Sequence, residues 1–363
     1  MKVLNQEMTN EMLKGLTGDH IEVGVENVGQ FLQQNGVLVK VNIGRIRNYI
    51  EVNPKIFGVD VDKSEELGEF FKEYIKNGSM TFIPNSDEKV LHNIEAKVRT
   101  KKDRMALGYN NEYMTLDIYK EFAQYVKEAE KEYLEKRDII VSKWDDKIDG
   151  MGDLIEEGLI TKFKKSLKKS LEEMNAVNGL HAFEQVISKL PSKEDYINSF
   201  YLKIKLSAFP IAQNLDLFDE ELSEQIKRDC LQDSINSVNE ILGNTLSDCF
   251  TVVNNLLVSY DKGGKIAHKT MAGLKEGAKR ITQKNLFKSP MIDSIARDMI
   301  NMASLSEADE IAEKSEVVLS KIYGYADEVN LVSKLDLNKS VLSEEELDII
   351  YKSFKMESES TSA

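Results

Sequence analysis

Several short groups of residues in this sequence have types and spacings that catalytic and metal sites use. Asp87 with Glu95 and Lys97 has the acid and lysine pattern with which nucleases hold magnesium and position water. His181 and Glu184 have the spacing that places two metal ligands on one face of a helix. Both groups lie in helical hydrophobic patterns, whereas the nuclease pattern requires a strand edge, and the histidine pair has no second copy. We therefore expect no catalytic residues and no metal site.

A third group, Gly263-Gly264-Lys265, resembles part of a phosphate-binding loop. A loop of that kind follows a strand and carries the pattern Gly-x-x-x-x-Gly-Lys-Ser/Thr, which does not occur here. We interpret the two glycines as a turn between two helices. The sequence thus predicts a protein that is not an enzyme and that needs no cofactor.

The strongest local signal is a reversal of charge. The chain of 363 residues has a formal net charge of −14, whereas segment 262–288 holds eight basic residues and one acid, a net charge of +7. At about 100° per residue, a helix over 265–284 places its cations on one half and its apolar residues on the other. Such a helix is suited to phosphates, anionic lipid or an acidic protein surface, although a solvated helix face is the ordinary alternative. Its candidate binding residues are Lys265, Lys269, Lys275, Lys279, Arg280 and Lys284.

Acidic residues gather between the two long helices expected in the middle of the chain. A cluster of carboxylates there forms an acidic tip, which is suited to the basic helix of a neighbouring copy, and this pairing predicts self-association that depends on salt. Its residues are Asp145, Asp146, Asp149 and Asp153. Two smaller basic clusters, at 97–104 and 162–169, are interpreted as solvated helix faces.

Composition and hydropathy limit the class of protein. Charged residues make up 30% of the chain and apolar residues 41%, proportions typical of a folded, strongly helical protein. No run of about eighteen apolar residues exists, so the sequence predicts no transmembrane segment. Residues 1–35 lack the pattern of a secretory signal. Cys230 and Cys249 are expected to be reduced core residues, as in a cytoplasmic protein.

The order of patterns along the chain predicts its elements. Segments 37–43 and 79–83 are rich in β-branched and aromatic residues and are expected to pair as two strands. Residues 115–149 predict one long helix, with residues 153–176 as its antiparallel partner across a turn at Gly150 and Gly152. Further helices are expected at 179–189, 193–207, 218–260, 264–285, 291–323 and 343–355.

These elements predict a mainly α fold: an elongated multi-helix protein with a long antiparallel helical arm and a small N-terminal two-stranded β element. Pro210 is the best boundary between domains. The expected regions are an N-terminal segment, a small α+β region with the β-ribbon, the arm with its following helices, a C-terminal helical domain and a disordered tail. They cover residues 1–36, 37–113, 114–209, 210–355 and 356–363, respectively.

Five short motifs lie between Val37 and Met302: Val41-Asn42-Ile43-Gly44-Arg45, Met80-Thr81-Phe82-Ile83-Pro84, the long helix that ends near Trp144, Leu190-Pro191-Ser192 with Phe200-Tyr201, and Phe209-Pro210-Ile211. In these motifs the chain resembles an uncharacterised family of bacteriophage and prophage proteins that are predominantly helical. In such genomes, members of this family are encoded near MoxR-type AAA+ ATPases and von Willebrand A-like proteins. The resemblance implies an adaptor or client in a remodelling system, located in the host cytoplasm, and it supplies no catalytic residues.

The leading expectation is a non-enzymatic phage protein that assembles with itself or binds a phage or host protein. A nucleic-acid-associated accessory protein that binds phosphates through the basic helix is the first alternative. An inhibitor of a host defence protein is the second. Nothing in the sequence separates this inhibitor function from the leading expectation.

Overall fold

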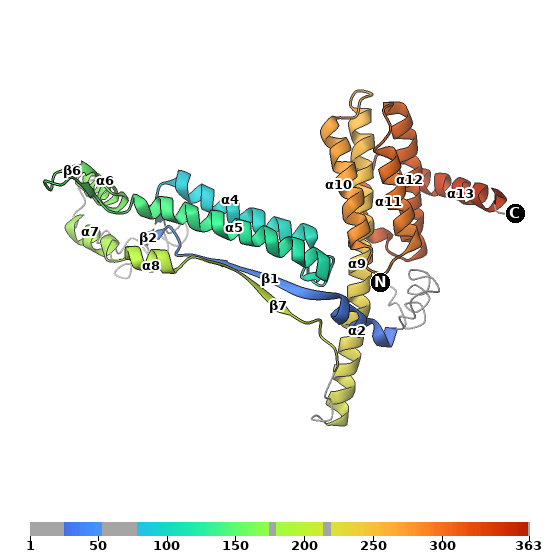
Figure 1. Ribbon diagram of the computed structural model, residues 1–363, viewed down its shortest axis with the longest axis horizontal. Coiled ribbons are helices and arrows are strands. Elements are labelled where there is room, and N and C mark those ends of the chain that lie inside the picture. The colour runs from blue at the N-terminus through green and yellow to red at the C-terminus, as the bar shows by residue number, and fades with distance from the viewer. Residues whose placement is uncertain (1–24, 53–77, 174–178, 213–218, 362–363) are drawn as a thin grey trace, which may run out of the picture. The chain divides into compact units, whose positions relative to one another are not determined.

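The computed structural model describes residues 25–52, 78–173, 179–212 and 219–361, which are mainly helical with a few short strands (Figure 1). The predicted mainly α fold class with a small β element is thereby confirmed. Residues 1–24 of the predicted N-terminal segment lie outside the described residues. The chain forms two compact units. Unit 1 takes its described residues from Met1–Val39, Asp103–Glu121 and Leu206–Ala363, and unit 2 from Lys40–Lys102 and Phe122–Lys205.

Unit 1 is a helical bundle built on the long helix α9 (Glu220–Asp261). The carboxylate of Asp219 caps α9 by accepting the N–H of Leu222 at 2.9 Å. Cys249 is buried in α9 as predicted, Cys230 is half-buried, and both thiols are free. Helices α2 (Val25–Asn35), α10 (His268–Lys284) and α12 (Ala308–Glu328) pack against α9, whereas α11 (Pro290–Met302) and α13 (Glu344–Thr361) pack against α12.

The prediction of one helix over 291–323 is wrong, because α11 and α12 are separated by a break at residues 303–307. At this break the Ser304 hydroxyl donates to the carbonyl of Asn301 at 2.6 Å, and bonds of this kind compete with the helical backbone pattern. The break allows α12 to pack against both α11 and α9.

The prediction of a disordered tail over 356–363 is wrong for residues 356–361, since α13 continues to Thr361. The first turns of α13 are fixed on α12. Leu347 is fully buried, and the Tyr351 hydroxyl donates to Glu328 at 2.9 Å. A helix that is anchored in this way extends at little further cost, because propagation follows nucleation easily.

Unit 2 contains most of an antiparallel helix pair, α4 (Asn85–Met105) and α5 (Leu116–Ser142). The Tyr133 hydroxyl on α5 donates to Glu95 on α4 at 2.8 Å, and the Lys101 ammonium lies 5.7 Å from the ring centroid of Tyr125. The predicted partner of the long helix, 153–176, is therefore wrong. That region forms part of a β-hairpin and then α6 (Leu159–Glu173), which packs against α7 (Gly179–Ile187).

The strands pair differently from the prediction. β1 (Gly36–Gly44) lies between β4 (Tyr113–Thr115) and β7 (Tyr201–Ser207), with Val37 opposite Met114. β2 (Ile50–Val52) pairs with β3 (Gly78–Met80). The expected pairing of 37–43 with 79–83 is thus wrong. Gly36 favours the observed partner, because a Cβ there would lie 2.5 Å from the carbonyl oxygen of Met114.

The predicted helix 193–207 is wrong in its second half. α8 (Lys193–Asn198) begins at Ser192, whose hydroxyl accepts the N–H of Asp195 at 3.0 Å, and β7 follows it. Along β7 Leu202 is buried while Tyr201 and Lys203 are exposed, which is the alternation of a half-buried strand.

The two units do not follow the five consecutive regions that the sequence suggests. The chain passes between the units at 39/40, 102/103, 121/122 and 205/206, that is, within β1, near the end of α4, early in α5 and within β7. The last of these positions is close to the predicted boundary at Pro210. The other three lie inside regions that local patterns treat as continuous, so the small α+β region and the arm each contribute to both units.

Candidate functional site

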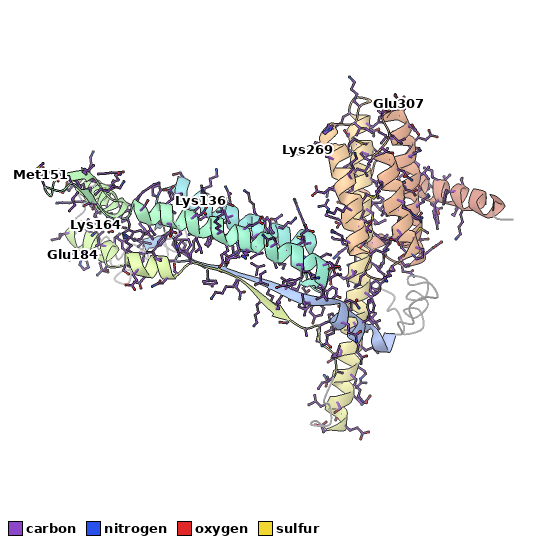
Figure 2. The ribbon with its side chains drawn as sticks, viewed as in Figure 1. Lys136, Met151, Lys164, Glu184, Lys269 and Glu307 are labelled. Atoms are coloured by element: carbon purple, nitrogen blue, oxygen red, sulfur yellow. The ribbon has the colours of Figure 1, made fainter. Side chains whose placement is uncertain are left out.

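The basic helix has the predicted amphipathic form. Leu274, Ala278 and Ile281 on α10 are fully buried, whereas Lys269, Lys275 and Lys279 are exposed. Figure 2 shows Lys269 near the start of this helix. Lys262 and Lys265 precede the helix and are also exposed, while Arg280 is half-buried. We define the α10 basic surface as Lys262, Lys265, Lys269, Lys275 and Lys279.

Lys284 does not belong to this surface, and its place among the predicted binding residues is corrected. Its side chain is 5% exposed, and its ammonium lies 2.6 Å from the carboxylate of Asp248 on α9. On a helix Lys284 lies about 60° from Lys269, turned toward the buried face at Gly277. A buried lysine needs a charged partner, so Lys284 holds α10 on α9 and is not available to a ligand.

The α10 basic surface keeps its positive charge. None of its five ammonium groups forms an ion pair with a residue that the structure describes, and the exposed acids beside it are Asp261 and Glu276. The other two basic clusters differ, since Lys162 and Lys165 pair with Glu156 and Glu157, and Arg99 lies 3.8 Å from Glu95. The α10 surface is therefore the part of the described chain where cations gather without local neutralisation.

The predicted acidic tip is a β-hairpin, formed by β5 (Lys147–Ile148) and β6 (Leu154–Glu156). At its base the carboxylate of Asp146 accepts the N–H of Gly158 at 2.7 Å, and the carbonyl of Lys143 accepts the N–H of Leu159 at 2.7 Å. The bond from Gly158, and then one from Thr161, lower the pKa of Asp146. Asp145 forms an ion pair with Lys193 at 2.6 Å.

The turn of the hairpin is fixed by one carboxylate. Asp149 accepts the N–H of Asp153 at 2.8 Å and that of Met151 at 2.9 Å, and these bonds lower the pKa of Asp149. Gly152 has a φ of +92°, a conformation that disfavours other residues. Two of the four predicted tip residues, Asp146 and Asp149, therefore also shape the hairpin.

The structure brings a feature to this tip that the sequence reasoning missed. Four large apolar side chains are exposed on the hairpin: Ile148 by 64%, Met151 by 90%, Leu154 by 51% and Ile155 by 68%. Figure 2 shows Met151 at one end of the unit that contains α6. The signal was available in the sequence, because Asp149-Gly150-Met151-Gly152-Asp153 is a turn between two short apolar segments. The prediction of a helix over 153–176 instead assigned Leu154 and Ile155 to a buried seam.

Gly158 supplies a first test of how the hairpin is held. A Cβ at this position would lie 2.4 Å from the backbone carbon of Asp145 and 2.5 Å from the carbonyl oxygen of Trp144. Gly158→Ala is therefore expected to destabilise unit 2 by about 2–3 kcal/mol, because the backbone must shift. Thermal melts followed by circular dichroism measure this. Gly150→Ala is the control, since its Cβ meets no atom within 4 Å, and an equal loss in both variants would contradict the account.

Of the three nuclease-like residues, only Glu95 lies in a buried ionic cluster in unit 2, whereas Lys97 is exposed. The side chain of Arg45 is 9% exposed, and its Nε donates to Oε1 of Glu95 at 2.8 Å while its two terminal nitrogens donate to Glu88. The same Oε1 of Glu95 accepts the Tyr133 hydroxyl at 2.8 Å. Asp87 pairs with Lys143 at 3.5 Å. Glu95 on α4 is thus occupied by an arginine that directly follows β1 and a tyrosine on α5.

The partners of Arg45 stabilise its charged form. Burial tends to lower the pKa of Arg45, but hydrogen bonds and charge from Glu88 and then Glu95 outweigh it and raise the pKa. Burial, and then the bond to Glu95, raises the pKa of Tyr133. The cluster is a structural one. His181 and Glu184 are both exposed on α7, and the described residues contain no group of three acids, histidines or cysteines that could hold a metal ion.

No family model matches this chain, and no curated protein or solved structure shows significant similarity to it. The resemblance to a phage family stays a prediction of the sequence. Among the described helices, none combines the length and the apolar character needed to cross a lipid bilayer.

Proposed function

We propose that this protein is a non-enzymatic interaction module that assembles with other copies of itself through the β5–β6 hairpin. The observation that supports the proposal is the exposure of Ile148, Met151, Leu154 and Ile155 on one short hairpin. Single exposed apolar residues are common, whereas a group at one place is typical of a surface that binds another protein. The phage origin and the inhibition of host defence remain predictions of the sequence.

Burial of the four exposed apolar side chains can contribute a substantial free energy of association. Full burial of one such side chain contributes about 1.5–3 kcal/mol. Association costs roughly 4–15 kcal/mol in lost translational and rotational freedom. Four apolar side chains therefore offset a large part of that cost, and charged groups around them supply further affinity.

The hairpin is also organised before it binds. Its turn is held by the bonds from Met151 and Asp153 to Asp149, and its base by the bond from Gly158 to Asp146. A binding element that is already ordered loses less conformational entropy on association. Segment 145–157 carries six acidic residues and one lysine, a net charge of −5. This charge disfavours an anionic membrane and favours a basic protein surface.

The experiment compares the oligomeric mass of the wild-type chain with that of a hairpin variant, Ile148→Ser with Met151→Ser, Leu154→Ser and Ile155→Ser. Sedimentation velocity is expected to show a wild-type mass that rises with concentration in the micromolar range, and a variant that stays monomeric. A matched control replaces four exposed apolar residues elsewhere, Leu180, Ile300, Ile349 and Met356, with serine. A monomeric wild type, or a hairpin variant that associates like the wild type, contradicts the proposal.

A further inference from the structure

We infer that the hairpin of one copy docks on the α10 basic surface of a second copy, an inference that rests on the proposed function. The two surfaces carry opposite charge. Segment 145–157 carries a net charge of −5, which ion pairs of three of its acids with Lys162, Lys165 and Lys193 reduce to −2. Segment 262–288 carries a net charge of +7, which the ion pair of Lys284 with Asp248 reduces to +6. Oppositely charged surfaces accelerate encounter and disfavour wrong partners.

Charge repulsion disfavours the hairpin as its own partner. A contact between two copies of the same hairpin would place two surfaces of net negative charge against each other. Like charges brought together at an interface cost several kcal/mol, so this pairing is disfavoured. A different surface of the second copy must receive the hairpin.

Ion pairing distinguishes α10 from the other two basic clusters. The clusters at 97–104 and 162–169 contain cations that already pair with acids, such as Arg99 with Glu95 and Lys165 with Glu157. The five lysines of the α10 basic surface have no ion-pair partner among the described residues. This surface therefore offers the most positive charge that an incoming acidic hairpin can use.

The inferred contact joins two different surfaces, and this has a consequence for the size of the assembly. Each copy carries both a hairpin and an α10 basic surface, so each copy binds two neighbours. Contacts of this heterologous kind produce rings or filaments and do not stop at a dimer. The assembly should also dissociate as salt is raised, because the Debye length falls from about 10 Å at 0.1 M to about 3 Å at 1 M.

The test uses two variants that each lack one of the two surfaces. The first is the hairpin variant with four serines, and the second carries Lys269→Glu, Lys275→Glu and Lys279→Glu. Each variant alone is expected to be monomeric at concentrations where the wild type associates, with self-affinity reduced about tenfold or more. An equimolar mixture is expected to form a one-to-one dimer, because one variant keeps a hairpin and the other keeps a basic surface.

The outcomes separate this inference from the proposed function. A charge-matched control reverses three exposed lysines of unit 2, Lys97, Lys127 and Lys203, and should associate like the wild type. If the α10 variant still associates while the hairpin variant does not, the inference is wrong and the proposed function stands. If both variants associate, both are wrong. A short DNA duplex that binds through the α10 lysines without affecting assembly would identify a phosphate-binding surface and overturn the inference.

Discussion

Replacing Arg45 with alanine is expected to destabilise unit 2 by about 3–5 kcal/mol, the typical cost of breaking a buried ion pair from one side. The guanidinium is the shared partner of Glu88 and Glu95, and the side chain of Glu95 is only 12% exposed. Without Arg45 the carboxylate of Glu95 keeps the Tyr133 hydroxyl and loses its closest charged partner. A buried carboxylate in that position must be protonated or solvated, and either process costs free energy.

The measurement uses the intrinsic fluorescence of Trp144, the one tryptophan of the chain, which lies in unit 2. Urea denaturation followed at this tryptophan reports the unfolding of unit 2. Arg99→Ala is the control, because Arg99 is 50% exposed and its guanidinium lies 3.8 Å from Glu95, so its loss should cost about 1 kcal/mol or less. Equal effects of the two substitutions would show that the buried ionic cluster around Arg45 stabilises unit 2 no more than an exposed ion pair does.

Trp144→Ala is the second substitution with a large expected effect, about 3–5 kcal/mol, the usual range for removing a buried aromatic side chain. Trp144 is 5% exposed and packs with its ring centroid 5.0 Å from that of Tyr196 and 6.3 Å from that of Phe82. Its removal leaves a cavity between α8 and the segment before α4. Trp144→Phe retains a ring at this position and should cost clearly less.

Thermal unfolding followed by circular dichroism measures the stability of Trp144→Ala, because this variant lacks the tryptophan used as the fluorescent probe. The hairpin should also loosen, since the carbonyl of Trp144 lies at its base, 3.5 Å from the N–H of Ile160. Faster proteolysis within segment 147–156 is therefore expected in Trp144→Ala at temperatures where unit 2 is still folded. Unchanged melting of the alanine variant would mean that the aromatic cluster contributes little to unit 2.

The sequence was sufficient to predict elements whose causes are local. The amphipathic character of α10 follows from the spacing of Leu274, Ala278 and Ile281, which needs no information about other segments. The burial of Lys284 could not be predicted in the same way. Its partner Asp248 lies 36 positions earlier, on another helix, and only the packing of α10 on α9 brings the two charges together.

The pairing of strands likewise could not be predicted from local sequence patterns. Segment 37–43 was recognised as a strand from its β-branched residues, but its partner β4 has only three residues and no strong pattern. Segment 79–83 resembled a strand more than Tyr113–Thr115 does. The pairing with β4 is fixed by long-range contacts, including a bond from the Tyr113 hydroxyl to the carbonyl of Leu32 at 2.9 Å.

At the hairpin, the charge pattern of the sequence identified the region but did not predict its exposed apolar side chains. Asp145, Asp146, Asp149 and Asp153 were correctly placed near one another, because they are close in sequence. The sequence did not show that the carboxylates of Asp146 and Asp149 accept backbone N–H groups. It also did not show that Leu154 and Ile155 lie outside a helix, since a helical seam and an exposed strand share the same short apolar pattern.

The repeated passage of the chain between the two units limits how the molecule can be taken apart. Any fragment of consecutive residues that holds all of unit 2 also holds Asp103–Glu121 of unit 1. A single proteolytic nick at one of the four crossings leaves three covalent connections intact. Neither unit can therefore be released by truncation from one end, and experiments that isolate one of them require an internal deletion or a circularly permuted chain.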